Sequence, residues 1–257
     1  HPSFKALADL PLAEKVARMR DPELRAKLLA EAPGPSHPFM EAVLQSFEKT
    51  FLLGDPPNYE QDPSQSLGAQ ARARGIRPEE LAYDLLLEDD GRAMLYFPFL
   101  NYADNSLEPS LAMMKHPHSI LGLGDGGAHL GTICDASFST HMLTHWTRDR
   151  TRGERLSIPE VIQWHTRDTA AAVGLNDRGL LKPGYKADVN LIDYDRLRLK
   201  PPRMVHDLPA GGRRLMQEAE GYRYAVVSGQ VTYADGQPTD ALPGRLVRGA
   251  KSAPAVR

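Results

Sequence analysis

The pattern of apolar and polar positions divides the chain into a helical front and a β-rich end. Residues 13–32 carry apolar side chains at irregular helical spacing, which predicts a helix that Pro22 interrupts. Helical spacing recurs in five further segments: 67–74, the segment after Pro78, 107–115, 137–148 and 158–173. From about residue 180 onward, short apolar runs alternate with glycine turns, a pattern that predicts strands.

Two short apolar runs within the helical front predict buried strands. Residues 93–100 read AMLYFPFL, and residues 119–123 read SILGL. The helix expected at 107–115 lies between them, which is the order that a parallel βαβ crossover requires. Asn101 and Tyr102 follow the first of these strands, so we expect them at the rim of the sheet where the second strand also ends.

The second strand runs into a glycine cluster that holds one acid, Asp125. A parallel strand delivers its last polar side chain to the rim where α/β enzymes place their chemistry, so Asp125 is the first catalytic candidate. An aspartate between glycines is also ordinary turn chemistry. His129 follows four residues later, and two interpretations stay open: it shares the rim and holds a metal or passes a proton, or it only bonds the backbone.

The string GLGDGG at 122–127 matches a dinucleotide-binding fingerprint and follows a predicted strand. That fingerprint opens a helix directly, and an acid at the end of a second strand about twenty residues later holds the ribose. Here the equivalent position falls in the charged segment HWTRDRTRGE, with no apolar strand before it. The spacing therefore disfavours a nucleotide site.

Two histidine pairs have the spacing of metal ligands. His141 and His145 are four apart on a predicted helix, but Met142 stands where a metalloprotease helix has its catalytic glutamate, which favours an ordinary helix face. His116 and His118 form an H-x-H at the entry of the second strand, away from the catalytic rim, which favours turn residues.

Composition narrows the class of protein further. The 257 residues are 41% hydrophobic and 25% charged, with a formal net charge of −2, so there is no electrostatic footprint for nucleic acid or an anionic membrane. Cys134 is the single cysteine, which excludes an internal disulfide and a cysteine zinc cluster.

No apolar run has membrane-spanning length and no secretory signal opens the chain, which predicts a cytoplasmic protein. The first residue is His1, so the chain is either processed or a piece of a longer protein.

The segment LGLGDGGAHLGTICDASFSTHMLTHWTRDR resembles the region around the eighth barrel strand of the amidohydrolase superfamily, in its D-aminoacylase or N-acyl-D-amino-acid deacylase branch. The resemblance covers nearly the whole chain and continues through WHTRDTAAAVGL, GLLKPGYKADVNLID, HDLPAGGRRL and ALPGRLVRG. It implies an α/β fold, with the last strands and helices of a TIM-like (β/α) barrel in residues 1–179. Residues 180–257 would form a segment of a small β-sandwich domain.

The resemblance also implies a reaction. In that family an acid at the end of the eighth strand activates a zinc-bound water, which attacks an amide carbonyl, and later passes the proton to the leaving amine. Asp125 takes the position of that acid, as general base and acid and as a weak metal ligand. The implied substrate is a small N-acyl-D-amino acid. Asn101, Tyr102, His129 and Arg148 are candidate substrate-binding residues because of their position at the rim or after the strand.

The chain departs from the family pattern in its metal ligands. The family's early H-x-H, its bridging ligand and its two mid-barrel histidines have no counterpart in this sequence. We therefore expect the chain to be the C-terminal part of a longer deacylase that needs the N-terminal half of its barrel or an oligomeric partner. Alone, it is expected neither to bind zinc tightly nor to turn over substrate.

Two alternative functions stay open at this point. A cyclic amide or imide hydrolase of the same superfamily, similar to a hydantoinase, would use Asp125 in the same way. A non-catalytic subunit that completes its barrel by docking with another chain would also account for the missing ligands.

Overall fold

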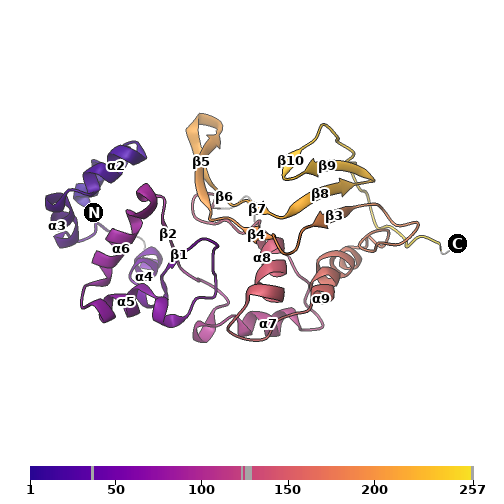
Figure 1. Cartoon of the computed structure of the whole chain (residues 1–257), viewed down its shortest axis with the longest axis horizontal. Helices are drawn as coiled ribbons and strands as arrows, with labels where there is room; N and C mark the ends of the chain where they lie inside the picture. Colours follow the sequence, from indigo (N-terminus) through magenta and orange to yellow (C-terminus); the bar gives the residue numbers. More distant parts are fainter. Residues whose placement is uncertain (36–37, 123, 125–128, 256–257) are drawn as a thin grey trace. The chain divides into compact units, whose positions relative to one another are not determined.

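A computed structural model of the protein describes residues 1–35, 38–122, 124 and 129–255 (Figure 1). The chain folds into two compact units, His1–Pro109 (unit 1) and Ser110–Arg257 (unit 2). The domain boundary expected after residue 179 falls inside unit 2 and stays a prediction. Within the described residues, no helix is both long and apolar enough to cross a lipid bilayer.

Unit 1 is mainly helical. Its helices are α1 Pro2–Lys5, α2 Leu12–Met19, α3 Pro22–Ala30, α4 Pro38–Leu44, α5 Leu67–Arg74 and α6 Pro78–Leu86. Its 3₁₀ turns are η1 Phe47–Lys49, η2 Pro63–Gln65, η3 Glu88–Gly91 and η4 Ala103–Asn105. The break predicted at Pro22 is confirmed: the Asp21 carboxylate accepts from the Glu23 and Leu24 amides, at 2.8 and 3.2 Å, and starts a new helix.

The core of unit 1 lies between α5 and α6. Leu67 and Ala71 of α5 pack against Leu81 and Leu85 of α6, and all four side chains are buried. Helix α5 has the bounds that the sequence pattern predicts and is capped by Ser66. Helix α6 begins at Pro78, where the sequence predicts a helix start.

The parallel βαβ crossover predicted for residues 93–123 is wrong. Strand β2, Met94–Tyr96, pairs antiparallel with β1, Phe51–Leu53, and Tyr96 lies opposite Phe51. Residues 119–122 of the second predicted strand are not in a strand, and Ile120 is 59% exposed. A strand needs a neighbour for its backbone N–H and C=O groups, and among the described residues none pairs with 119–122.

The helical part of unit 2 contains α7 Glu108–Met114, which crosses the boundary between the units, and three further helices: α8 Phe138–Thr144, α9 Ile158–Gln163 and α10 Thr169–Ala172. Two π-helical turns interrupt the longer predicted helices, η5 His145–Asp149 after α8 and η6 Trp164–Asp168 after α9. The helix start predicted at Ser157 is confirmed, because the Ser157 hydroxyl accepts from the Glu160 amide at 3.3 Å.

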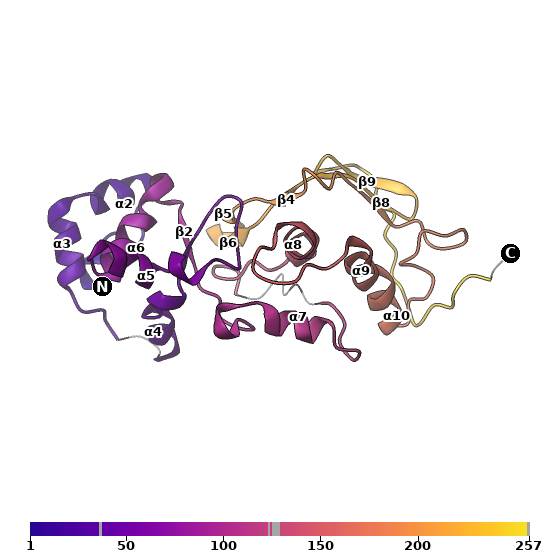
Figure 2. The same cartoon turned by 60° about the horizontal axis from the view of Figure 1, so that its bottom comes forward.

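The β-rich end is confirmed as a set of short antiparallel sheets. Its strands are β3 Val189–Ile192, β4 Arg198–Leu199, β5 Arg203–Leu208, β6 Gly212–Met216, β7 Ala219–Glu220, β8 Tyr222–Val227, β9 Gln230–Ala234 and β10 Gln237–Pro238, with a 3₁₀ turn at η7 Pro209–Gly211. One sheet has the order β10-β9-β8-β3, and β4 pairs with β7 and β5 with β6. Figure 2 shows α8 and α9 on one side of the four-stranded sheet. The described structure is thus a mixed α/β fold.

Candidate functional site

The candidate catalytic residue Asp125 lies outside the described residues, so the site is built from the segments on either side of it. Gly124, directly before it, packs against the start of α8. A Cβ at Gly124 would lie 3.1 Å from Cδ1 of Phe138 and 3.2 Å from Cα of Ala136. Since real Cβ atoms seldom approach other atoms this closely, a larger residue at position 124 would require Phe138 or the backbone of Ala136 to shift by a few tenths of an ångström.

The segment after Asp125 begins with a turn at His129. This residue has a left-handed φ of 49°, and its carbonyl accepts from the amides of Thr132 at 2.8 Å and Ile133 at 3.1 Å. The next carbonyl, that of Leu130, accepts from the Leu215 amide of β6 at 2.7 Å. The backbone of His129 therefore forms the turn, while its imidazole is on an exposed residue. Its predicted part in substrate binding stays a prediction.

Hydrogen bonds from the β-rich end hold α8 and η5 in place. The hydroxyls of Thr140 and Tyr222 lie 2.8 Å apart, and those of Thr147 and Tyr194 lie 2.6 Å apart. Thr140 is buried, so its bond to the half-buried Tyr222 is partly shielded from water. The β-rich end thus positions both the loop after Asp125 and the helix that packs against Gly124.

Arg148, a candidate substrate-binding residue, is used inside unit 2. Its Nη1 donates to the Tyr194 carbonyl at 2.5 Å, and its Nη2 donates to the Leu197 carbonyl at 2.7 Å. Its guanidinium also pairs with Asp149 and lies 5.3 Å from the centre of the Tyr194 ring. The hydrogen bond to the Asp149 carboxylate raises the pKa of Arg148. These contacts give Arg148 a structural role at the junction between η5 and the loop before β4.

The other two candidates, Asn101 and Tyr102, belong to unit 1. Asn101 is exposed and has a left-handed φ of 57°. Tyr102 is buried, and its hydroxyl donates to the Gln61 carbonyl at 3.3 Å. The hydroxyl of the neighbouring Tyr96 donates to the Tyr59 carbonyl at 3.4 Å, and burial raises the pKa of Tyr96. Tyr102 lies close enough to Tyr96 to contribute to the raised pKa of that hydroxyl.

The two histidine pairs have different local contacts in the structure. The rings of His141 and His145 stack with their centres 4.7 Å apart and their planes 12° apart, and His145 is buried. His116 accepts at Nδ1 from the His118 amide at 3.2 Å, as a turn residue does. No three His, Cys, Asp or Glu side chains gather closely enough to hold a metal ion in the described part of the chain. The described residues therefore do not fit the zinc site that the resemblance implies.

Two polar groups near Gly124 were not foreseen from the sequence. Oδ1 of Asp135 and Nε2 of His165 are buried and have no hydrogen-bond partner within the described residues. Both residues contact Phe138: the Asp135 carbonyl accepts from the Phe138 amide at 3.0 Å, and the His165 ring meets the Phe138 ring edge-on with their centres 5.8 Å apart. Burial lowers the pKa of His165. His165 lies in the WHTRD string, but no periodicity in that string indicates its burial.

Comparison with known proteins shows the family and a short stretch of similarity to a curated relative. The amidohydrolase family profile matches residues 1–233. A 5-methylthioadenosine/S-adenosylhomocysteine deaminase from Pelotomaculum thermopropionicum is 47% identical over 60 residues. That match covers 23% of this chain and spans only 13% of the deaminase's length. No solved structure matches the chain significantly.

Proposed function

Because this chain belongs to the amidohydrolase family, we propose that it serves the hydrolysis of N-acyl-D-amino acids or related linear amides, with Asp125 as the general base and acid. The observation that carries the proposal is the family match over residues 1–233, which includes the GDGGAH string around Asp125. That string resembles the last catalytic strand of the deacylase branch. The amidohydrolase family consists of hydrolases that are generally metal-dependent.

In the proposed reaction, Asp125 carries out two proton transfers. Its carboxylate takes a proton from the attacking water as the water oxygen bonds to the amide carbonyl carbon. It then gives this proton to the nitrogen as the C–N bond breaks, and the products are a carboxylate and a free amine. A positioned acid–base group typically contributes about 10²- to 10⁴-fold in rate.

The proposed architecture follows from the same resemblance. Residues 1–179 would contribute the last part of a TIM-like barrel, and residues 180–257 a segment of a β-sandwich domain. Since the described residues do not fit a metal site, the proposal assigns the metal ligands to a polypeptide that carries the earlier barrel strands. His129 is an exposed residue four positions after Asp125 and is the first choice for a substrate contact in unit 2.

Metal analysis and an activity assay of the purified chain test whether the metal ligands lie on another polypeptide. The chain alone is expected to hold less than stoichiometric zinc and to release no D-amino acid from N-acetyl-D-amino acids. Adding the polypeptide with the earlier strands is expected to give stoichiometric zinc binding and release of the D-amino acid. Stoichiometric zinc together with turnover by the chain alone would contradict the assignment of the ligands to another polypeptide.

A second candidate is hydrolytic deamination, which the short match to the deaminase favours. In that reaction water attacks a ring carbon that bears an amino group, and the proton goes to the departing ammonia, so Asp125 would serve it in the same way. An assay with three substrates separates the candidates: an N-acetyl-D-amino acid, 5-methylthioadenosine and a hydantoin. In a preparation that combines this chain with the polypeptide that carries the earlier strands, the proposal predicts turnover of the first substrate. Turnover of only the second or the third would replace the proposal by deamination or by cyclic amide hydrolysis.

A further inference from the structure

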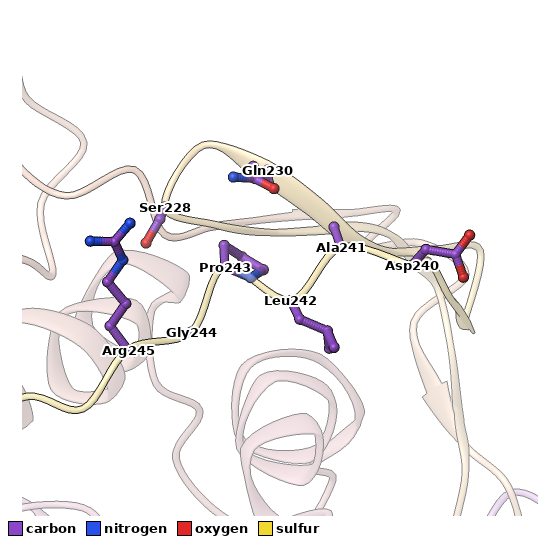
Figure 3. Close-up of a pocket in the computed structure, with 8 residues that line it drawn as sticks. All are labelled: Ser228, Gln230, Asp240, Ala241, Leu242, Pro243, Gly244 and Arg245. Atoms are coloured by element: carbon purple, nitrogen blue, oxygen red, sulfur yellow. The ribbon is translucent and has the colours of Figure 1, made fainter.

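A hollow of about 650 Å³ opens on the surface of unit 2 (Figure 3). One wall is the turn between β8 and β9, which contributes Ser228 and Gln230. The other wall is the extended segment 240–245, which contributes Pro243 and Arg245. The hollow is far in the sequence from Asp125, and the proposed reaction makes no use of it.

The turn that forms the first wall has a serine, Ser228, at a position where the backbone is left-handed. Ser228 and Gly229 have φ angles of 51° and 79°, the left-handed pair of a type I′ hairpin turn. The next hairpin of the same sheet has the same conformation at Asp235 and Gly236, with φ angles of 46° and 79°. Aspartate followed by glycine is a preferred pair for this turn, whereas serine is not. Non-glycine residues in such conformations are often retained at functional sites.

The hydroxyl of Ser228 is available for a ligand. The Ser228 amide donates to Oδ1 of Asp188 at 2.8 Å, and the Gly229 amide donates to the Ala187 carbonyl at 2.9 Å, so the backbone of the turn is fixed. The Ser228 hydroxyl makes no hydrogen bond to any described residue. The turn therefore holds an unused donor at the rim of the hollow.

Arg245 supplies an unused cation at the same hollow. Its residue is exposed, and its guanidinium forms no hydrogen bond or ion pair with the part of the chain that the structure describes. By contrast, Arg223 on β8 pairs with Asp235 at 3.1 Å. In Figure 3 the Arg245 guanidinium is turned toward Ser228, while the Asp240 carboxylate lies at the opposite end and is turned outward.

We propose that this hollow binds a small oxyanion, a carboxylate or a phosphate, between Arg245 and Ser228. The planar guanidinium presents two parallel N–H donors that match two oxygens of such an anion. The Ser228 hydroxyl donates to an oxygen from the opposite wall. The exposed position of Arg245 predicts weak binding, with a Kd on the order of millimolar.

Titration of the ¹⁵N-labelled chain with acetate and with inorganic phosphate tests the proposal, at constant ionic strength and with chloride as the reference anion. The amide signals of Gly229 and Gly244 report on the two walls. Saturable shifts with either oxyanion, and none with chloride, are expected; the tighter of the two identifies the ligand class. Shifts that do not saturate with either, or that chloride reproduces, would overturn the proposal.

Three variants assign the donors. Arg245→Gln is expected to weaken binding about tenfold or more, and Arg248→Gln, the control at a neighbouring exposed arginine, is expected to leave it unchanged. Ser228→Gly suits the turn and removes the hydroxyl, so it is expected to fold well and to bind about threefold more weakly. Full binding by Arg245→Gln or by Ser228→Gly would contradict the proposed pair of donors.

Discussion

Phe138, the first residue of α8, lies so close to Gly124 that a Cβ at position 124 would come within 3.1 Å of its Cδ1. The chain that leads into Asp125 is therefore packed against α8. Since Tyr222 of β8 hydrogen-bonds to Thr140 of the same helix, the β-rich end is connected through α8 to the candidate catalytic segment.

Gly124→Ala is expected to destabilise unit 2 by about 1–3 kcal/mol, because the added methyl group forces Phe138 and the backbone of Ala136 to move. Gly122→Ala is the matched control, since a Cβ there meets nothing within 4 Å. Urea denaturation of both variants measures the difference. Equal unfolding free energies for the two variants would show that the close packing at Gly124 does not constrain the chain.

Arg148→Met keeps most of the side-chain stem and removes the donors to the Tyr194 and Leu197 carbonyls. The two carbonyls lose their partner, so the variant is expected to unfold about 1–3 kcal/mol more easily. Arg167→Met, at an exposed arginine, serves as the control. A substrate-binding role for Arg148 predicts instead a raised KM with unchanged stability, so urea denaturation and steady-state kinetics together decide between the two roles.

The hydroxyl pair of Thr140 and Tyr222 is suited to a double-mutant cycle. Thr140→Val and Tyr222→Phe each remove one partner with little change in shape, and the coupling free energy between them is expected to be about 0.5–1.5 kcal/mol. Urea denaturation of the two single variants and the double variant gives this value. Purely additive effects would mean that this bond does not link α8 to the sheet.

His165 is expected to make stability depend on pH. Because burial lowers its pKa in the folded chain, the unfolded chain binds the proton first as the pH falls. The contribution of neutral His165 is fully present above its unfolded pKa of about 6.5 and is lost as the pH falls through the lower folded pKa. His165→Phe should reduce the loss of stability between about pH 7 and pH 5. An unchanged slope in this variant would contradict the role of the half-buried imidazole.

Local features of the fold were predictable where one physical signal dominates. Helical spacing gives the bounds of α5, Pro78 marks the start of α6, and glycine turns mark the β-rich end. The pairing of β2 was not predictable, because the apolar run at 93–100 fits a parallel or an antiparallel partner equally well, and β1 lies over forty residues earlier in the chain. The contacts of Arg148 were not predictable either, because its acceptors are main-chain carbonyls of a distant segment and no residue pattern indicates them.

The role of Asp125 as the proton-transferring residue is the central claim, and kcat for an N-acetyl-D-amino acid tests it most directly. In a preparation where the wild-type chain is active, Asp125→Asn is expected to lower kcat by about 10²- to 10⁴-fold with little change in KM. Asp9→Asn, at an exposed aspartate of unit 1, is expected to leave kcat unchanged. Wild-type kcat in Asp125→Asn would contradict the claim.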